Sequence, residues 1–76
     1  MGSYRFVVGL EPDLAVLERE TSVAVLDLFG NGVTWVLLRV AANRIDSVKA
    51  CFGGIAHVYE TEEEARRVWQ IFGRSV

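Results

Sequence analysis

The side chains best suited to chemistry in this sequence are its only histidine, His57, and its only cysteine, Cys51. A general base needs an orienting acid or a nucleophile beside it, and a nucleophilic thiol needs a base. The sequence places neither kind of partner, because His57 lies inside an apolar run and Cys51 lies beside Phe52. We therefore expect structural roles for both side chains, no catalytic residues, and a protein that is not an enzyme.

Acidic residues and glycines could supply metal or phosphate sites, but their spacing here does not favour either. The acids that cluster are Glu60, Glu62, Glu63 and Glu64. At the start of a helix such carboxylates complement the positive end of the helix dipole. The glycines of Gly30-Asn31-Gly32 and Gly53-Gly54 match neither the GxxxxGK[ST] nor the GxGxxG pattern of phosphate-binding loops. We expect no metal and no cofactor.

The clearest structural element is a helix over residues 62–72. Thr61 and Glu64 have the spacing of a capping box, in which the two residues satisfy each other's free amides. Gly73 is a natural residue for the end of the helix. The helix carries an apolar stripe of Ala65, Val68, Trp69 and Phe72, and opposite charges at i,i+4 in Glu62/Arg66 and Glu63/Arg67.

A shorter helix over residues 44–52 is expected before this one. Asn43 is a good N-cap, and Gly53-Gly54 stops the helix. Its apolar side chains are Ile45, Val48 and Phe52. The apolar run 55–59 then predicts a buried strand between the two helices.

Two β-branched runs, Ser22–Phe29 and Val33–Val40, predict a hairpin because they flank Asn-Gly. A three-residue loop pairs Phe29 with Val33. One face of the hairpin is then apolar and should meet the helices, through the pairs Leu28/Thr34, Leu26/Val36 and Ala24/Leu38. The opposite face is mixed, with the pairs Val25/Leu37, Asp27/Trp35 and Val23/Arg39. A two-residue loop would change all of these pairings.

Tyr4–Leu10 predicts a first strand, and Pro12 suits the first turn of a helix containing Leu14 and Leu17. Residues 13–21 also fit a strand, or part of one helix over 13–29. The favoured order gives an α+β fold over residues 1–76 as a single domain. It is a two-layer sandwich with a four-stranded antiparallel sheet of ferredoxin-like β-α-β-β-α-β order and an added C-terminal helix.

Composition restricts the setting and the partners. The 76 residues are 51% hydrophobic, and the net charge is −2, which provides no overall field to attract nucleic acid or anionic membrane. A single cysteine cannot form an internal disulfide, which favours a reducing, cytoplasmic location. No apolar run approaches the ~20 residues of a membrane span, and no signal-peptide pattern is present. We expect no membrane association.

The strands of the hairpin are apolar on both faces, whereas two short helices can cover only one. Either the C-terminal helix or a second chain must cover the other face. We expect a non-enzymatic, homo-oligomeric protein-binding or adaptor domain. The candidate interface residues are Val25, Asp27, Trp35, Leu37, Arg39 and Trp69. A small-ligand regulatory domain, with its ligand at a dimer interface, is a further possibility that the fold permits.

Part of the sequence resembles RNA-recognition motifs, whose sheet stacks nucleobases on aromatic side chains. Residues 5–10 resemble the first-strand hexamer of that family, and residues 54–65 resemble its third strand and second helix. The sequence departs from the pattern at His57, which replaces the central aromatic, at Gly53, which replaces a basic residue, and in having no strand after the last helix. The alternative function is therefore nucleic-acid binding through Tyr4, Phe6 and Trp35, with Arg5, Arg39 and Arg44 beside them.

Overall fold

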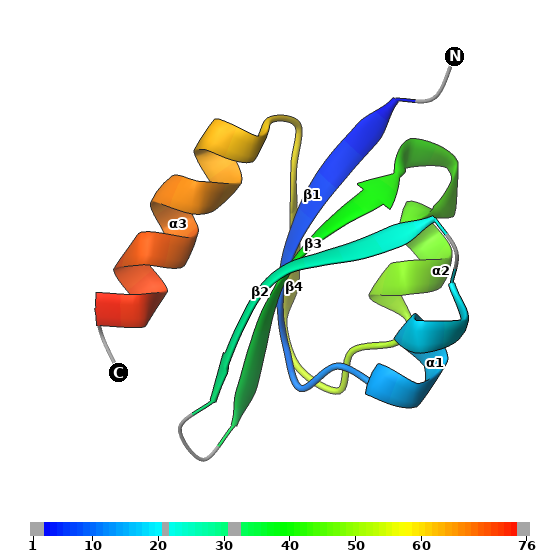
Figure 1. The fold of residues 1–76 in the computed structure, drawn as a ribbon, viewed down its shortest axis with the longest axis horizontal. Helices are drawn as coiled ribbons and strands as arrows, with labels where there is room; N and C mark the ends of the chain where they lie inside the picture. Colours follow the sequence, from blue (N-terminus) through cyan, green and yellow to red (C-terminus); the bar gives the residue numbers. More distant parts are fainter. Residues whose placement is uncertain (1–2, 21, 31–32, 75–76) are drawn as a thin grey trace.

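The computed structural model describes residues 3–20, 22–30 and 33–74. In chain order they form β1 (Tyr4–Leu10), α1 (Leu14–Arg19), β2 (Val23–Gly30), β3 (Thr34–Ala41), the 3₁₀ turn η1 (Ala42–Arg44), α2 (Ile45–Lys49), β4 (Ala56–Tyr59) and α3 (Glu62–Arg74). The strands form one open antiparallel sheet in the order β2-β3-β1-β4, with β2 and β4 at its edges (Figure 1). The chain is therefore an α+β protein, as expected.

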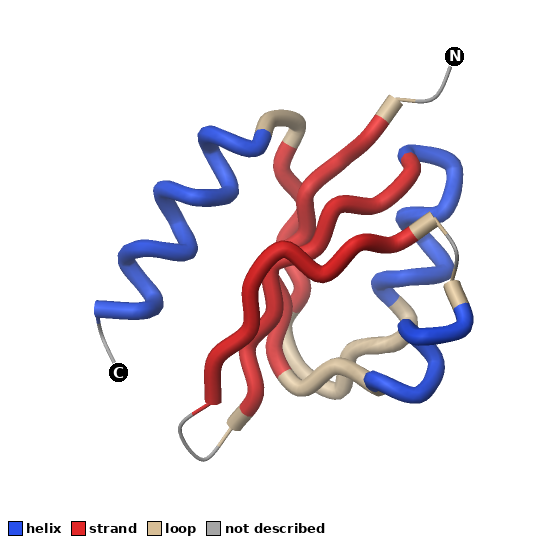
Figure 2. Tube along the Cα trace, in the orientation of Figure 1, coloured by secondary structure: helices blue, strands red, loops and turns tan. Residues whose placement is uncertain are grey.

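Helices lie on both faces of this sheet (Figure 2). The face covered by α1 and α2, here the α1/α2 face, has the buried core Val7, Leu17, Val36, Leu38, Val40 and Val48. The opposite α3 face has the buried core Val8, Leu37, Ala65 and Trp69. The expected two-layer sandwich is therefore wrong. Neighbouring residues of β1 and β3 are apolar on both sides of the sheet, and α3 covers the second side.

The signals that predicted α3 are all local, and most of them are present. Thr61 Oγ1 accepts the Glu64 amide at 3.3 Å, while its hydroxyl, rather than its amide, contacts the Glu64 carboxylate at 3.3 Å. Both i,i+4 ion pairs form at 2.7 Å, Arg66 with Glu62 and Arg67 with Glu63. The helix continues through Gly73 to Arg74, two residues beyond the expected end. The side chain of Phe72, expected in the apolar stripe, lies outside the described side chains.

Residues 14–19 form a helix, so neither the strand over 13–21 nor the long helix over 13–29 occurs. Asp13 is the N-cap, and its carboxylate accepts the Val16 amide at 3.3 Å. Pro12 therefore precedes the cap and does not occupy the first helical position. Leu17 is the buried residue of this short helix.

The helix expected over residues 44–52 is shorter in the structure, as η1 followed by α2. Asn43 lies inside η1 and is not an N-cap. The helix ends early because the turn after β1 binds the backbone that would have continued it. Asp13 N donates to Cys51 O at 2.7 Å, Gly53 N donates to Glu11 O at 2.9 Å, and Pro12 forms an isolated bridge with Phe52.

The hairpin has a different register from the expected one. Leu28 lies opposite Val36 instead of Thr34. Further from the turn, toward the start of β2, a β-bulge lies between Val25 and Asp27. A bulge adds one residue to one strand, so all residues beyond it change face. Val25 therefore pairs with Leu38 and lies on the α1/α2 face. The predicted grouping of Val25 with Asp27 is wrong for this reason.

Gly9 allows the aromatic ring of Phe52 to pack directly on β1. A Cβ atom at Gly9 would lie well inside van der Waals contact with three atoms of that ring. We expect Gly9→Ala to lower the free energy of unfolding by about 1–3 kcal/mol through overpacking, measured by urea denaturation. The control is Gly53→Ala, whose new Cβ would meet its nearest atom, Glu11 O, at an ordinary 3.5 Å. Equal losses from the two substitutions would contradict this account.

Candidate functional site

Several exposed apolar side chains surround a groove between α1 and the edge strand β2. The groove has a volume of about 300 Å³. Leu17 and Val23 form its buried and half-buried parts, whereas Leu14, Val25 and Leu28 are 43%, 54% and 50% exposed. Side chains of this type are usually buried, and exposed apolar patches of a folded domain often mark contacts with another molecule. We call this surface the α1–β2 groove.

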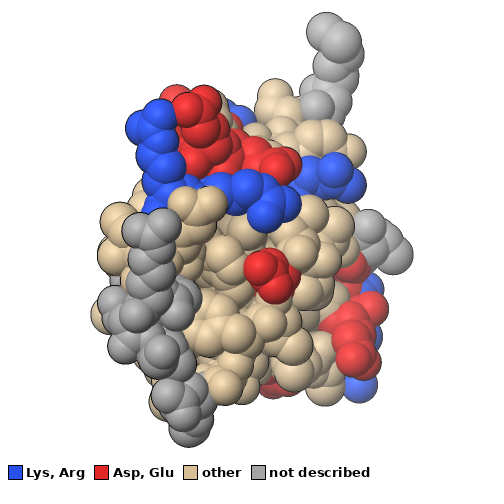
Figure 3. Space-filling model, turned by 60° about the vertical axis from the view of Figure 1, so that its left-hand side comes forward, with Lys and Arg blue, Asp and Glu red and all other residues tan. Residues whose placement is uncertain are grey.

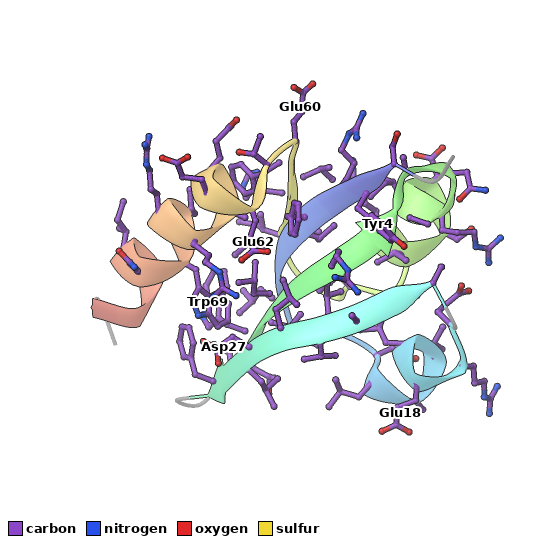
Figure 4. All side chains as sticks on the ribbon, turned by 45° about the horizontal axis from the view of Figure 1, so that its top comes forward. Tyr4, Glu18, Asp27, Glu60, Glu62 and Trp69 are labelled. Atoms are coloured by element: carbon purple, nitrogen blue, oxygen red, sulfur yellow. The ribbon has the colours of Figure 1, made fainter. Side chains whose placement is uncertain are left out.

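Two carboxylates lie at the α1–β2 groove, and their electrostatic settings differ. Glu20 forms a bidentate ion pair with Arg44, with Nη2 to Oε1 and Oε2 distances of 2.9 and 3.2 Å. Glu18 has no ion pair with any described residue, and it projects outward from α1 (Figure 4). The next residue, Arg19, is also exposed and likewise has no ion pair within the described part of the chain. The groove therefore presents one acid, Glu18, that is available to a partner, and the exposed base Arg19 follows it in α1.

The six candidate interface residues do not form one exposed patch. Four of them, Asp27, Trp35, Leu37 and Trp69, lie on the α3 face, where Leu37 is fully buried and Trp69 is 7% exposed. These two side chains are covered by the chain's own packing and have almost no surface to offer a second chain. Val25 lies on the opposite face in the α1–β2 groove, and the Arg39 guanidinium lies 5.0 Å from the centre of the Tyr4 ring.

Asp27 joins α3 to the edge strand. Its Oδ2 accepts the indole Nε1–H of Trp69 at 2.8 Å, and its Oδ1 accepts the amide of Leu28 at 2.8 Å (Figure 4). The Phe29 ring meets the Trp69 ring edge-on at 4.8 Å and stacks near Trp35 at 6.4 Å between centroids. This cluster, which the sequence suggested as an interface, closes one end of the α3 face.

The residues suggested for stacking nucleobases are only partly accessible. Phe6 and Trp35 are half-buried against the core under α3, while Tyr4 is half exposed. Arg44 is paired with Glu20 on the other side of the molecule, and Arg5 donates to the Tyr4 carbonyl at 3.0 Å. Figure 3 shows charged side chains gathered at the end where α3 begins and again along the right-hand edge of the view, with a mainly uncharged surface between them. Of the residues expected to bind nucleic acid on this side of the molecule, Tyr4 and Arg39 are the exposed ones.

Cys51 and His57 lie on opposite faces of the sheet. Cys51 packs with the α1/α2 core, and its thiol donates to the Ser47 carbonyl at 3.3 Å. His57 lies opposite Val8 in β4 and is exposed on the α3 side. Within residues 3–20, 22–30 and 33–74, no three His, Cys, Asp or Glu side chains are placed to share a metal ion. The two side chains cannot act together in proton transfer or nucleophilic attack.

Burial raises the pKa of the Cys51 thiol, and the nearby carboxylates of Asp13 and Glu20 raise it further. The reactive form of a cysteine is the thiolate, so a raised pKa slows alkylation at neutral pH. We expect iodoacetamide to modify Cys51 in the folded protein several-fold more slowly than in the urea-unfolded chain at pH 7.5. The rate for the folded protein should continue to rise above pH ~8.5, where an ordinary thiol has half ionised. Equal rates in the two states would show that the fold does not protect the thiol.

No family model, curated protein or solved structure matches this chain. None of the helices in the described part of the chain has the length and apolar character that crossing a membrane requires.

Proposed function

We propose that this chain is a non-enzymatic protein-binding domain that docks its partner on the α1–β2 groove. The observation that carries the proposal is the exposure of Leu14, Val25 and Leu28 around one concave surface. Covering such side chains would contribute about 25 cal/mol for each Å² of apolar surface removed from water. The proposed contact surface lies on the α1/α2 face, whereas most residues of the interface expected from the sequence lie on the α3 face. Val25 belongs to the expected interface and to the groove.

One further feature favours a binding role, and an arrangement of the fold and a cellular location are proposed beside it. The Cys51 thiol has a raised pKa and lies across the sheet from His57, which favours binding over catalysis. The strand order β2-β3-β1-β4 and the alternation of elements support a ferredoxin-like arrangement with α3 added on the second face. A cytoplasmic location is proposed from the single cysteine, Cys51, which has no second cysteine with which to form an internal disulfide.

Photo-crosslinking in the source cells tests the docking surface. A benzophenone amino acid at position 25 should give discrete covalent adducts with protein, because Val25 lies in the groove and is 54% exposed. The matched control is the same probe at Gln70, an exposed position on α3. Adducts from position 25 that are no more abundant than those from position 70 would refute the proposal.

Nucleic-acid binding is the second candidate, and the exposed Tyr4–Arg39 pair is the observation in its favour. A cation stacked on a half-exposed aromatic ring can hold a base and a phosphate together. Fluorescence anisotropy with a single-stranded RNA should then show binding that weakens with salt and is lost in Arg39→Ala. Absence of binding at low salt would remove this candidate.

A further inference from the structure

The two free edges of the sheet differ in how far the chain itself closes them. On β2, the bulge between Val25 and Asp27 interrupts the ladder. The Val23 amide donates to the Glu20 carbonyl at 3.3 Å, and the Leu28 amide donates to the carboxylate of Asp27 at 2.8 Å. Bulges and covered backbone groups are devices by which sheets avoid pairing with other chains. The β2 edge is therefore protected against an added strand.

The strand β1 directs its backbone groups alternately to its two neighbours. The Leu10 amide donates to the Ile55 carbonyl at 2.8 Å on the β4 side, whereas the Glu11 amide donates to the Thr34 carbonyl at 2.7 Å on the β3 side. Antiparallel ladders alternate in this way along their length. The even-numbered residues of β1 therefore bond toward β4, and the odd-numbered residues bond toward β3.

The same alternation separates inner from outer residues on β4. His57 and Tyr59 lie opposite even-numbered residues of β1, so their backbone groups face inward. The N–H and C=O groups of Ala56 and Val58 consequently point to the free edge, beyond which the described part of the chain places no further strand. This edge offers two donors and two acceptors in the geometry that another extended backbone matches.

The side chains of β4 do not protect its edge. Residues 55–59 contain no proline, lysine or acidic residue, which are the usual edge-protecting types. Ile55 and Val58 are 58% and 37% exposed, and His57 is exposed as well. The strand has only four residues, so an added strand gains few backbone bonds and must also cover apolar side chains. A contact of this size suits a weak, transient interaction.

We infer that the β4 edge binds an extended segment of a partner protein, which joins the four-stranded sheet as an additional strand beside β4. The segment pairs its backbone with that of Ala56 and Val58, and apolar side chains at its alternate positions cover Val58. The edges β4 and β2 lie at opposite ends of the sheet. The inference therefore concerns a second surface and does not depend on docking in the α1–β2 groove.

Amide exchange of the purified full-length protein, measured by NMR, tests the inference. The probe is a short synthetic peptide in which valine and threonine alternate, because both residues favour strands. At a peptide concentration about ten times its Kd, exchange of the Ala56 and Val58 amides should slow by about tenfold. The amides of His57 and Tyr59, which face β1, should change little. The control is the same peptide with N-methylated amides, which cannot donate and should have no effect.

A substitution at the edge tests the role of the backbone donor. Val58→Pro removes an outward N–H without removing a bond to β1, a position at which edge strands tolerate proline. It should abolish peptide binding. The matched control Val58→Ala also loses the valine side chain but keeps the N–H, so it should still bind. Circular dichroism checks the fold of both variants, and the exchange measurement on the wild type tests the inference without them.

Three results would overturn the inference. In the first, the peptide leaves the exchange of Ala56 and Val58 unchanged. In the second, it protects amides of β2 instead, which would place the added strand at the other edge. In the third, exchange of Ala56 and Val58 slows without peptide as the protein concentration rises, which would make a second copy of this chain the occupant of the edge.

Discussion

Deletion of residues 61–76 is expected to leave a chain that does not fold cooperatively. Without α3, the side chains of Val8 and Leu37, both fully buried, would face water, and the chain would lose Ala65 and Trp69. Domains of this size have only about 3–5 kcal/mol of stability from a single core, so removal of one of two cores should abolish it. Circular dichroism during urea titration should show no sigmoidal transition, and the protein should be poorly soluble.

The control for this deletion removes surface contacts of α3 without removing its apolar side. Glu63→Ala/Arg67→Ala breaks an exposed ion pair of 2.7 Å and should cost less than about 1 kcal/mol. A deleted chain that remains soluble and melts cooperatively would show that the α1/α2 face holds the fold alone.

Trp69→Ala is expected to lower the free energy of unfolding by about 3–5 kcal/mol, as truncation of a buried aromatic side chain does in other cores. The ring is 7% exposed, packs with Phe29, and donates to Asp27. Urea denaturation followed by circular dichroism measures the loss. The loss should be close to the whole stability of a domain of this length.

The conservative variant Trp69→Phe separates burial from the hydrogen bond. It keeps most of the apolar surface and removes the indole N–H, so we expect a loss of about 1 kcal/mol. Asp27→Ala should cost about 1–3 kcal/mol, because it leaves the Trp69 indole and the Leu28 amide without their shared acceptor. If Trp69→Phe were as destabilising as Trp69→Ala, the hydrogen bond and not the buried ring would carry the effect.

Sequence reasoning succeeded where the signals act within one or two helical turns. The α3 helix carries its own cap and its own ion pairs, so Thr61 and Glu64 mark its start without reference to the rest of the fold. The order of strands and helices followed from similar local patterns. The early end of α2 was missed because its cause is distant in sequence: the backbone of Cys51 and Gly53 is bound by residues 11–13.

The candidate site was predicted only in part, because one bulge decides which residues share a face. Asp27, Trp35 and Leu37 were correctly grouped on one side of the hairpin, but α3 covers that side with Trp69. Leu14 and Leu28 were missed, and their partner Val25 was placed with the wrong neighbours. The only sequence signal for the groove was the apolar Leu14 directly after the N-cap Asp13. A polar residue would be equally compatible with the start of the helix at this position.

The position of β1 has a consequence for synthesis of the chain. β1 precedes β3 and β4 in the chain, yet it lies inside the sheet between them. Its residues Val7 and Val8 lie opposite residues of β3 and β4 that are more than 25 residues downstream and are therefore synthesised later. α3, which follows β4 in the chain, closes one of the two cores. β1 and β3 therefore lack part of their cover until α3 has also been synthesised, and burial of their apolar side chains competes with aggregation until then.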